Sequence, residues 1–216
     1  MERLIPDNSM PVPDATSAEA LDRYSAGTRI GGSKGQAWRD IRLSIFALPA
    51  EMDIFTIPAV TEPFIAWTTS GDVEMQEHEN DGPWLTSRIK GGSMFLTASG
   101  APYDLRWKSL SPEPFEAVLV VLSLPLFNEA LQEVFGDDAP SARLRDVPGF
   151  ADPRLTTLLE QLKQETKRPA ASALLVRGLA QALAVNIARE YTVLTESRAP
   201  NPRHSRDSSY GASPTG

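Results

Sequence analysis

The chain of 216 residues contains no cysteine and only two histidines, His78 and His204. The absence of cysteine excludes disulfides, thiolate metal sites and cysteine nucleophiles. Two histidines cannot make a three-histidine metal site, and the sequence has no Gly-x-Ser-x-Gly turn and no phosphate-binding loop. We therefore predict no catalytic residue, no metal ligand and no cofactor.

Long apolar runs and an excess of positive charge are also missing. No stretch approaches the roughly 18 apolar residues of a membrane span, and the first residues lack the apolar core of a signal peptide. Lys and Arg number 21 against 28 Asp and Glu, which gives a net charge of −7. A chain with this excess of negative charge is expected to bind nucleic acids poorly by itself. We expect a cytoplasmic protein without membrane contact.

Residues 36–122 consist of short apolar or alternating segments separated by turns. Residues 91–107 show the pattern well: paired glycines, an apolar run, a Ser-Gly-Ala-Pro turn, and an alternating segment that ends at Trp107. Alternation of this kind is typical of strands with one buried face. About eight strands at even spacing predict an antiparallel β-barrel or jelly roll.

The period of the apolar residues changes after residue 122. Ser123 can cap a helix over 124–135, Asp152 with Pro153 starts a second helix, and a third is expected over 171–196. The chain is therefore predicted to be α+β, with an N-terminal arm at 1–35, a helical segment at 123–196 and a disordered tail at 197–216. The helical leucines could cover the barrel or form a dimer interface, for which the candidates are Leu155, Leu159, Leu162, Leu175 and Leu179.

Two groups of residues in the barrel have more than one interpretation. Aromatic walls with one guanidinium and one phenol suit a small-molecule pocket, and they suit an ordinary barrel core equally well. The candidate ligand contacts are Trp67, Arg88, Phe95, Tyr103 and Trp107. An acidic cluster with one histidine could bind a divalent ion, but we interpret it as the solvated tip of a hairpin. This cluster consists of Glu74, Glu77, His78 and Glu79.

Four segments resemble the sensor domain of AraC-type transcription regulators across residues 36–195. They are GSMFLTASGAPYDLRW at 92–107, LSLP at 122–125, DPRL at 152–155 and AQALAVNIAREY at 180–191. The resemblance implies a cupin-like barrel that senses a small molecule, followed by helices that mediate dimerisation. It also places Tyr103 where metal-binding cupins carry the last histidine of their second motif, which favours sensing over catalysis.

AraC-type regulators continue with two helix-turn-helix units, and residues 197–216 carry no such pattern. The resemblance therefore implies a ligand-binding domain that acts in transcription regulation without binding DNA directly. Its expected partners are an unidentified small-molecule effector and either a second copy or a full-length regulator in a mixed dimer. The alternatives are a small cupin enzyme, such as an isomerase or oxygenase, and a truncated regulator.

Overall fold

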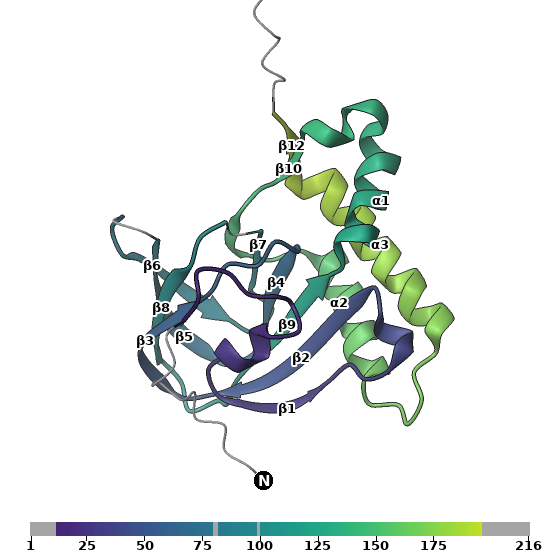
Figure 1. Ribbon diagram of the computed structural model, residues 1–216. Coiled ribbons are helices and arrows are strands. Elements are labelled where there is room, and N and C mark those ends of the chain that lie inside the picture. The colour runs from purple at the N-terminus through teal and green to yellow at the C-terminus, as the bar shows by residue number, and fades with distance from the viewer. Residues whose placement is uncertain (1–11, 80–81, 99, 196–216) are drawn as a thin grey trace, which may run out of the picture.

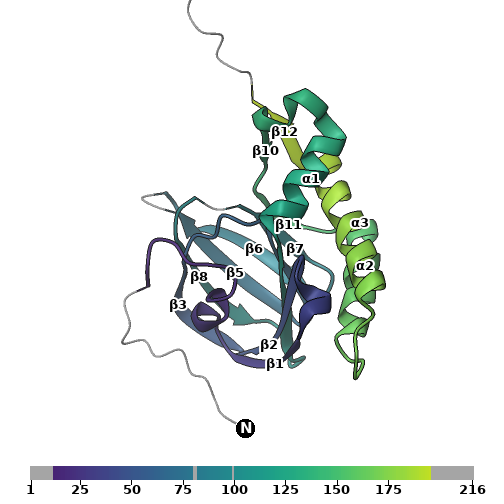
Figure 2. The same cartoon turned by 45° about the vertical axis from the view of Figure 1, so that its right-hand side comes forward.

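The computed structural model describes residues 12–79, 82–98 and 100–195. Two antiparallel sheets face each other, the second and third α-helices lie against the outer face of the larger sheet, and the first packs along the third beyond the end of the barrel (Figures 1 and 2). The order of the larger sheet is β1-β2-β9-β4-β7-β11, with bounds Thr28–Gly32, Ile41–Leu48, Phe115–Leu122, Phe64–Ser70, Met94–Thr97 and Val147–Phe150. The order of the smaller sheet is β3-β8-β5-β6, with bounds Glu51–Ile57, Tyr103–Ser109, Asp72–Glu79 and Leu85–Lys90. The predicted α+β jelly roll is confirmed.

Alternation along the strands of the larger sheet creates two separate cores. On β9, Val118 and Val120 are fully buried beneath the helices, whereas Ala117 and Leu119 face the smaller sheet. Successive side chains of a strand point to opposite faces, so one apolar strand can serve both layers. The nearly continuous apolar sequence of β9 is explained by this double burial.

The three helices begin at the positions that the capping residues indicate. They are α1 (Leu124–Phe135), α2 (Pro153–Glu165) and α3 (Ala173–Tyr191). The side chains of Ser123, Asp152 and Ser172 each accept a backbone N–H bond in the first turn that follows. The third helix is shorter than predicted, because the chain leaves α3 as strand β12 (Thr192–Leu194), which pairs with β10 (Ala142–Leu144). No helix in the described ranges is long and apolar enough to cross a bilayer.

Most of the leucines predicted to form a dimer interface lie inside the protein. Leu155, Leu159 and Leu162 have 0% exposure and pack in the core that α2 shares with α3 and the larger sheet. Leu179 is also buried, whereas Leu175 is 46% exposed. The prediction was wrong for the four buried leucines, because the apolar stripe of an amphipathic helix is taken up first by the core of its own domain.

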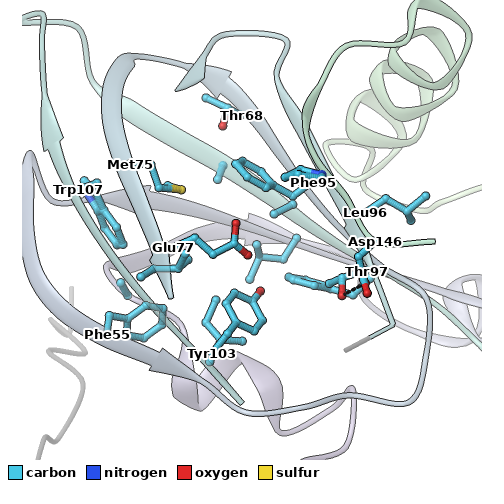
Figure 3. Close-up of a pocket in the computed structure, with 18 of the residues that line it drawn as sticks. Phe55, Thr68, Met75, Glu77, Phe95, Leu96, Thr97, Tyr103, Trp107 and Asp146 are labelled. Carbon is cyan, nitrogen blue, oxygen red and sulfur yellow. Dashed lines mark hydrogen bonds between the residues drawn. The ribbon is translucent and has the colours of Figure 1, made fainter. Parts of the chain in front are cut away.

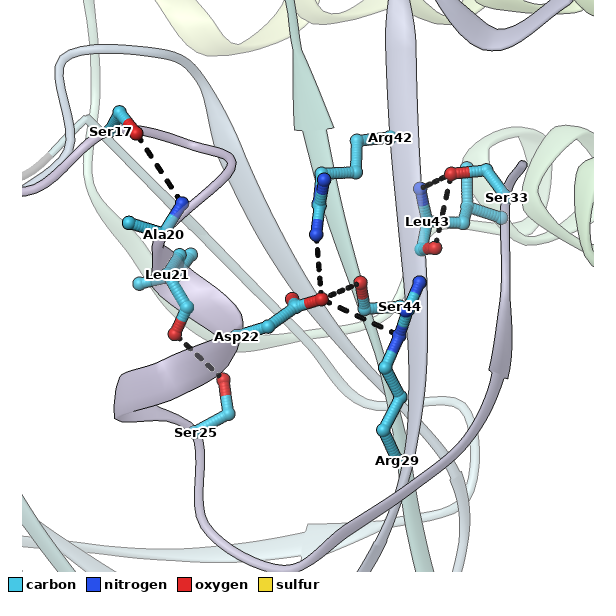
Figure 4. A network of polar contacts seen from close by, with 10 residues as sticks. All are labelled: Ser17, Ala20, Leu21, Asp22, Ser25, Arg29, Ser33, Arg42, Leu43 and Ser44. Atoms are coloured by element: carbon cyan, nitrogen blue, oxygen red, sulfur yellow. Dashed lines mark hydrogen bonds and ion pairs between the residues drawn. The ribbon is translucent and has the colours of Figure 1, made fainter. Parts of the chain in front are cut away.

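Part of the segment predicted to be an arm belongs to the barrel. Strand β1 pairs with β2, so the sheet begins at Thr28 and not at residue 36. Before it, the short helix η1 (Leu21–Tyr24) is held by Asp22, whose carboxylate accepts bonds from Arg42 at 2.7 Å and Ser44 at 2.9 Å (Figure 4). Arg29 forms an ion pair with the same carboxylate at 3.4 Å. Residues 1–11 and the predicted tail at 197–216 lie outside the described ranges.

Candidate functional site

The facing surfaces of the two sheets enclose a cavity of about 390 Å³ (Figure 3). Inward residues of β2, β4, β7 and β9 form one wall, and inward residues of β3, β5 and β8 form the other. Residues 25–26, residues 82–83, Leu85 of β6 and residues 146–148, at the start of β11, also line the cavity. A largely apolar space of this size, bounded by two sheets, suits a small organic molecule.

Aromatic rings form one end of the cavity. Trp107 on β8 donates its indole N–H to the carbonyl of Pro49 at 2.9 Å, which fixes the ring against the wall. Phe55 and Phe115 meet this ring edge to face, with centroid separations of 6.2 Å and 5.7 Å. Met75 lies directly opposite Trp107 in the register of β5 and β8. We call Phe55, Met75, Trp107 and Phe115 the aromatic end.

The other end of the cavity carries three carboxylates and a phenol. Glu77 and Glu79 follow Met75 at alternate positions of β5, and Tyr103 pairs with Glu79 in the register. Asp146 joins them from the segment between β10 and β11, where it accepts hydrogen bonds from the hydroxyl of Thr97 and the N–H of Ala98. We call Glu77, Glu79, Tyr103 and Asp146 the acidic end.

Burial and neighbouring negative charges raise the pKa values of Glu77 and Tyr103 in the acidic end. Burial raises the pKa of Glu77, and the neighbouring charges of Glu79 and Asp146 raise it further. The pKa of Tyr103 is raised for the same reasons, first by burial and then by the three carboxylates, so its phenol stays neutral. Lysine, arginine and histidine are absent among the described residues that line the cavity. The acidic end therefore offers negative charge without an internal counterion.

The five predicted ligand contacts divide into two groups. Phe95, Tyr103 and Trp107 lie in the cavity wall, and their contact with a ligand stays a prediction. Trp67 does not reach the cavity: it is 2% exposed and packs under the helices, with the ammonium of Lys163 5.5 Å from its ring centroid. Arg88 is also misplaced by the prediction, since its side chain is 58% exposed and pairs outside the barrel with Asp72. In both strands the predicted inward positions were wrong by one residue, and a shift of one residue places the side chain on the opposite face of the sheet.

Three residues of the acidic end were not singled out as ligand contacts: Glu77, Glu79 and Asp146. Glu77 was assigned to a solvated hairpin tip, but alternation along β5 turns Glu77 inward together with Met75. The alternation of residues along β5 could therefore have identified Glu77 as an inward residue from the sequence. Asp146 lies in a connecting segment and carried no signal in the sequence. In the described ranges no group of three or more His, Asp or Glu side chains is placed to hold a metal ion.

Asp146 also connects the cavity with the end of α3. The neighbouring residue, Arg145, donates its backbone N–H to the carbonyl of Tyr191 at 2.9 Å, and its guanidinium donates to the carbonyl of Glu190 at 2.6 Å. The pairing of β10 with β12 lies beside these bonds. Continuous polar contacts therefore link the acidic end of the cavity to the last turn of α3.

Comparison with solved structures shows that another protein shares this fold of a jelly-roll barrel with C-terminal helices. ToxT from Vibrio cholerae, an AraC-family regulator, was solved with an unsaturated fatty acid bound; it superposes with a TM-score of 0.50 and 12% identity over 73% of this chain. This chain spans 58% of the length of ToxT. A cupin domain from Bordetella pertussis matches 46% of this chain and 97% of its own length, with 12% identity and a TM-score of 0.33. No protein-family model and no curated protein matches the sequence.

Proposed function

We propose that this chain is the small-molecule-sensing and dimerisation domain of an AraC-type transcription regulator, located in the cytoplasm. The cavity between the two sheets is the observation that carries the proposal, because its apolar walls and its polar end suit an amphiphilic effector. The shared fold with ToxT, whose solved complex contains an unsaturated fatty acid, supports the same role. Any effect on transcription acts through a full-length regulator that binds DNA and forms a mixed dimer with this chain.

The proposed signal passes from the cavity to the helices through Asp146. An effector at the acidic end alters the position of Asp146, and Arg145 carries that change to the carbonyls of Glu190 and Tyr191 at the end of α3. Ligand binding can shift a conformational equilibrium only when the two states contact the ligand differently. The segment of residues 145–148 is placed to transmit such a difference, since it contacts both the cavity and α3.

The second proposed property is dimerisation through the exposed side of α3. Leu174 is 85% exposed and Leu175 is 46% exposed, and both stand in the first turn of the helix. A homodimer, or a mixed dimer with a full-length relative, would bury them. Light scattering at tens of micromolar tests the homodimer: Leu174→Glu should shift it toward monomer, whereas Leu110→Glu, at another exposed leucine, should not.

A cavity-filling variant tests the proposed sensing function. Ala66 lies on the inner face of β4, so Ala66→Phe should occupy the cavity, whereas Ala170→Phe in the exposed α2–α3 connection should leave it open. A ligand that binds only the folded state raises the melting temperature. We expect decanol to stabilise the wild type and Ala170→Phe but not Ala66→Phe. Equal stabilisation of all three proteins would contradict binding in the cavity.

The competing interpretation as a small cupin enzyme predicts a different result. A metal-dependent cupin would hold a stoichiometric iron, manganese or zinc ion in the purified protein. Tyr103 stands where the resemblance places the last metal-binding histidine, and it carries a neutral phenol, which is a poor metal ligand. We therefore expect metal analysis of the purified protein to find less than stoichiometric metal.

A further inference from the structure

The charge of the cavity specifies the kind of ligand more narrowly than its shape does. We infer that the cavity takes a cationic amphiphile, with a protonated amine facing Glu77 and Asp146 and an apolar body at the aromatic end. This inference rests on the proposed function, since it presupposes that a small molecule enters the cavity. The inference concerns only the charge of the ligand's head group, and its test is separate from the test of whether a small molecule enters the cavity.

Among the described residues, no basic side chain lines the acidic end of the cavity. On the outer face of the smaller sheet, Arg106 lies 4.2 Å above the ring of Trp84, and His78 stacks on the same ring. Arg88 pairs with Asp72 outside the barrel, and Arg145 donates to the end of α3. Arg106, Arg88 and Arg145 are therefore engaged away from the cavity.

Within the described ranges, Glu77 is the partly buried carboxylate of the acidic end for which the structure shows no stabilising contact. Asp146 already accepts bonds from Thr97 and Ala98, which fix its position at the rim. Glu77 has no hydrogen-bond partner in the described part of the chain, and its carboxylate points into the cavity (Figure 3). A partly buried carboxylate without a partner is unfavourable, and a ligand cation placed beside it removes that penalty.

The same arrangement disfavours a carboxylate ligand. An anionic head group at the acidic end would add to the repulsion that already raises the pKa of Glu77. A neutral head group would leave the repulsion as it is, and could accept a hydrogen bond from Tyr103. Discrimination between head groups therefore comes from repulsion as much as from attraction.

Titration calorimetry with three probes that differ only in the head group tests the inference. The probes are decylamine, decanol and decanoate, at pH 7 and below their micellar concentrations. We expect decylamine to bind roughly tenfold more tightly than decanol, and decanoate to bind most weakly. Decanoate or decanol binding as tightly as decylamine would overturn the cationic head group while leaving the sensing function intact. Failure of all three probes to bind would overturn both.

A charge-neutral variant separates the head-group contact from general binding. Glu77→Gln keeps the shape of the side chain and should weaken decylamine binding by roughly tenfold while leaving decanol binding within about twofold. Glu74→Gln is the matched control, because Glu74 stands on the same strand but is exposed on its outer face. Thermal unfolding of both variants verifies that they are folded. Equal decylamine affinity in Glu77→Gln and Glu74→Gln would overturn the assignment to Glu77.

Discussion

Tyr191, in the last turn of α3, donates its phenol hydrogen to the carboxylate of Asp152 at 2.6 Å. Asp152 is the N-cap of α2, where it also accepts the backbone N–H bonds of Arg154 and Leu155. One carboxylate therefore starts one helix and holds the end of another. Because Arg145 binds the carbonyl of Tyr191, this contact lies beside the connection between the cavity and α3.

Removing the phenol hydroxyl should loosen this helix contact. Burial acts to raise the pKa of Asp152, but the bonds from Tyr191, Leu155 and Arg154 outweigh it, so the pKa is lowered. Tyr191→Phe should reduce the free energy of unfolding by about 1–3 kcal/mol at pH 7, measured by urea denaturation. A carboxylate with a lowered pKa in the folded state contributes stability above its unfolded value of about 3.9, and loses it as the pH falls through the folded value. The difference between the variant and the wild type should therefore shrink below about pH 4, and a difference that is constant between pH 7 and pH 3 would contradict this role.

The Asp22 network should stabilise the N-terminal segment against the barrel. Asp22→Ala leaves Arg42 and Ser44 without their shared acceptor, and Ser44 is only 1% exposed. We expect a loss of about 1–3 kcal/mol in unfolding free energy, together with faster proteolysis before Thr28. Arg39→Ala removes an exposed ion pair with Asp40 and should cost less than about 1 kcal/mol. Equal effects of the two substitutions would show that the network adds nothing beyond a surface pair.

Glu165 should be required for the connection between α2 and α3. Its carboxylate is buried, accepts the N–H of Ser172 at 2.7 Å and lies 3.7 Å from the guanidinium of Arg168. Glu165→Ala leaves the N–H of Ser172 unpaired and should cost about 1–3 kcal/mol. Arg168→Ala should cost less than about 1 kcal/mol, because this arginine side chain is 71% exposed. Chemical denaturation of both variants gives the comparison, and a larger loss for Arg168→Ala would refute it.

Strand parity yields a prediction for the cavity wall. Phe95 lines the cavity and Arg88 does not, although both were candidates from the sequence. Phe95→Ala should weaken decanol binding by roughly tenfold, since it removes apolar contact area. Arg88→Ala should leave the affinity within about twofold, because its ion pair with Asp72 lies outside the barrel. Calorimetric titration with decanol compares the two variants. A larger loss of affinity for Arg88→Ala would mean that Arg88 faces the cavity, contrary to the structure.

Local patterns in the sequence were sufficient for the elements and for the fold class. Alternation marked the strands, and Ser123 and the pair Asp152-Pro153 marked two helix starts that the structure confirms. These features depend on neighbouring residues in the chain, because capping and side-chain alternation are properties of a single turn or strand. The order of the segments, together with their resemblance to AraC-type sensors, added the cupin-like architecture.

The tertiary structure alone decided which face of each strand is inside and which residues meet across the cavity. Alternation puts Trp67 and Ile65 on one face of β4, but only the packing of α2 and α3 makes that face the helical one. Asp146 stands 49 positions from Thr97, and only the pairing of β11 with β7 in the larger sheet brings them together. A one-residue change in parity exchanges inside and outside for a whole strand. The sequence by itself therefore determined a barrel with helices, whereas the acidic charge of its cavity depends on long-range packing.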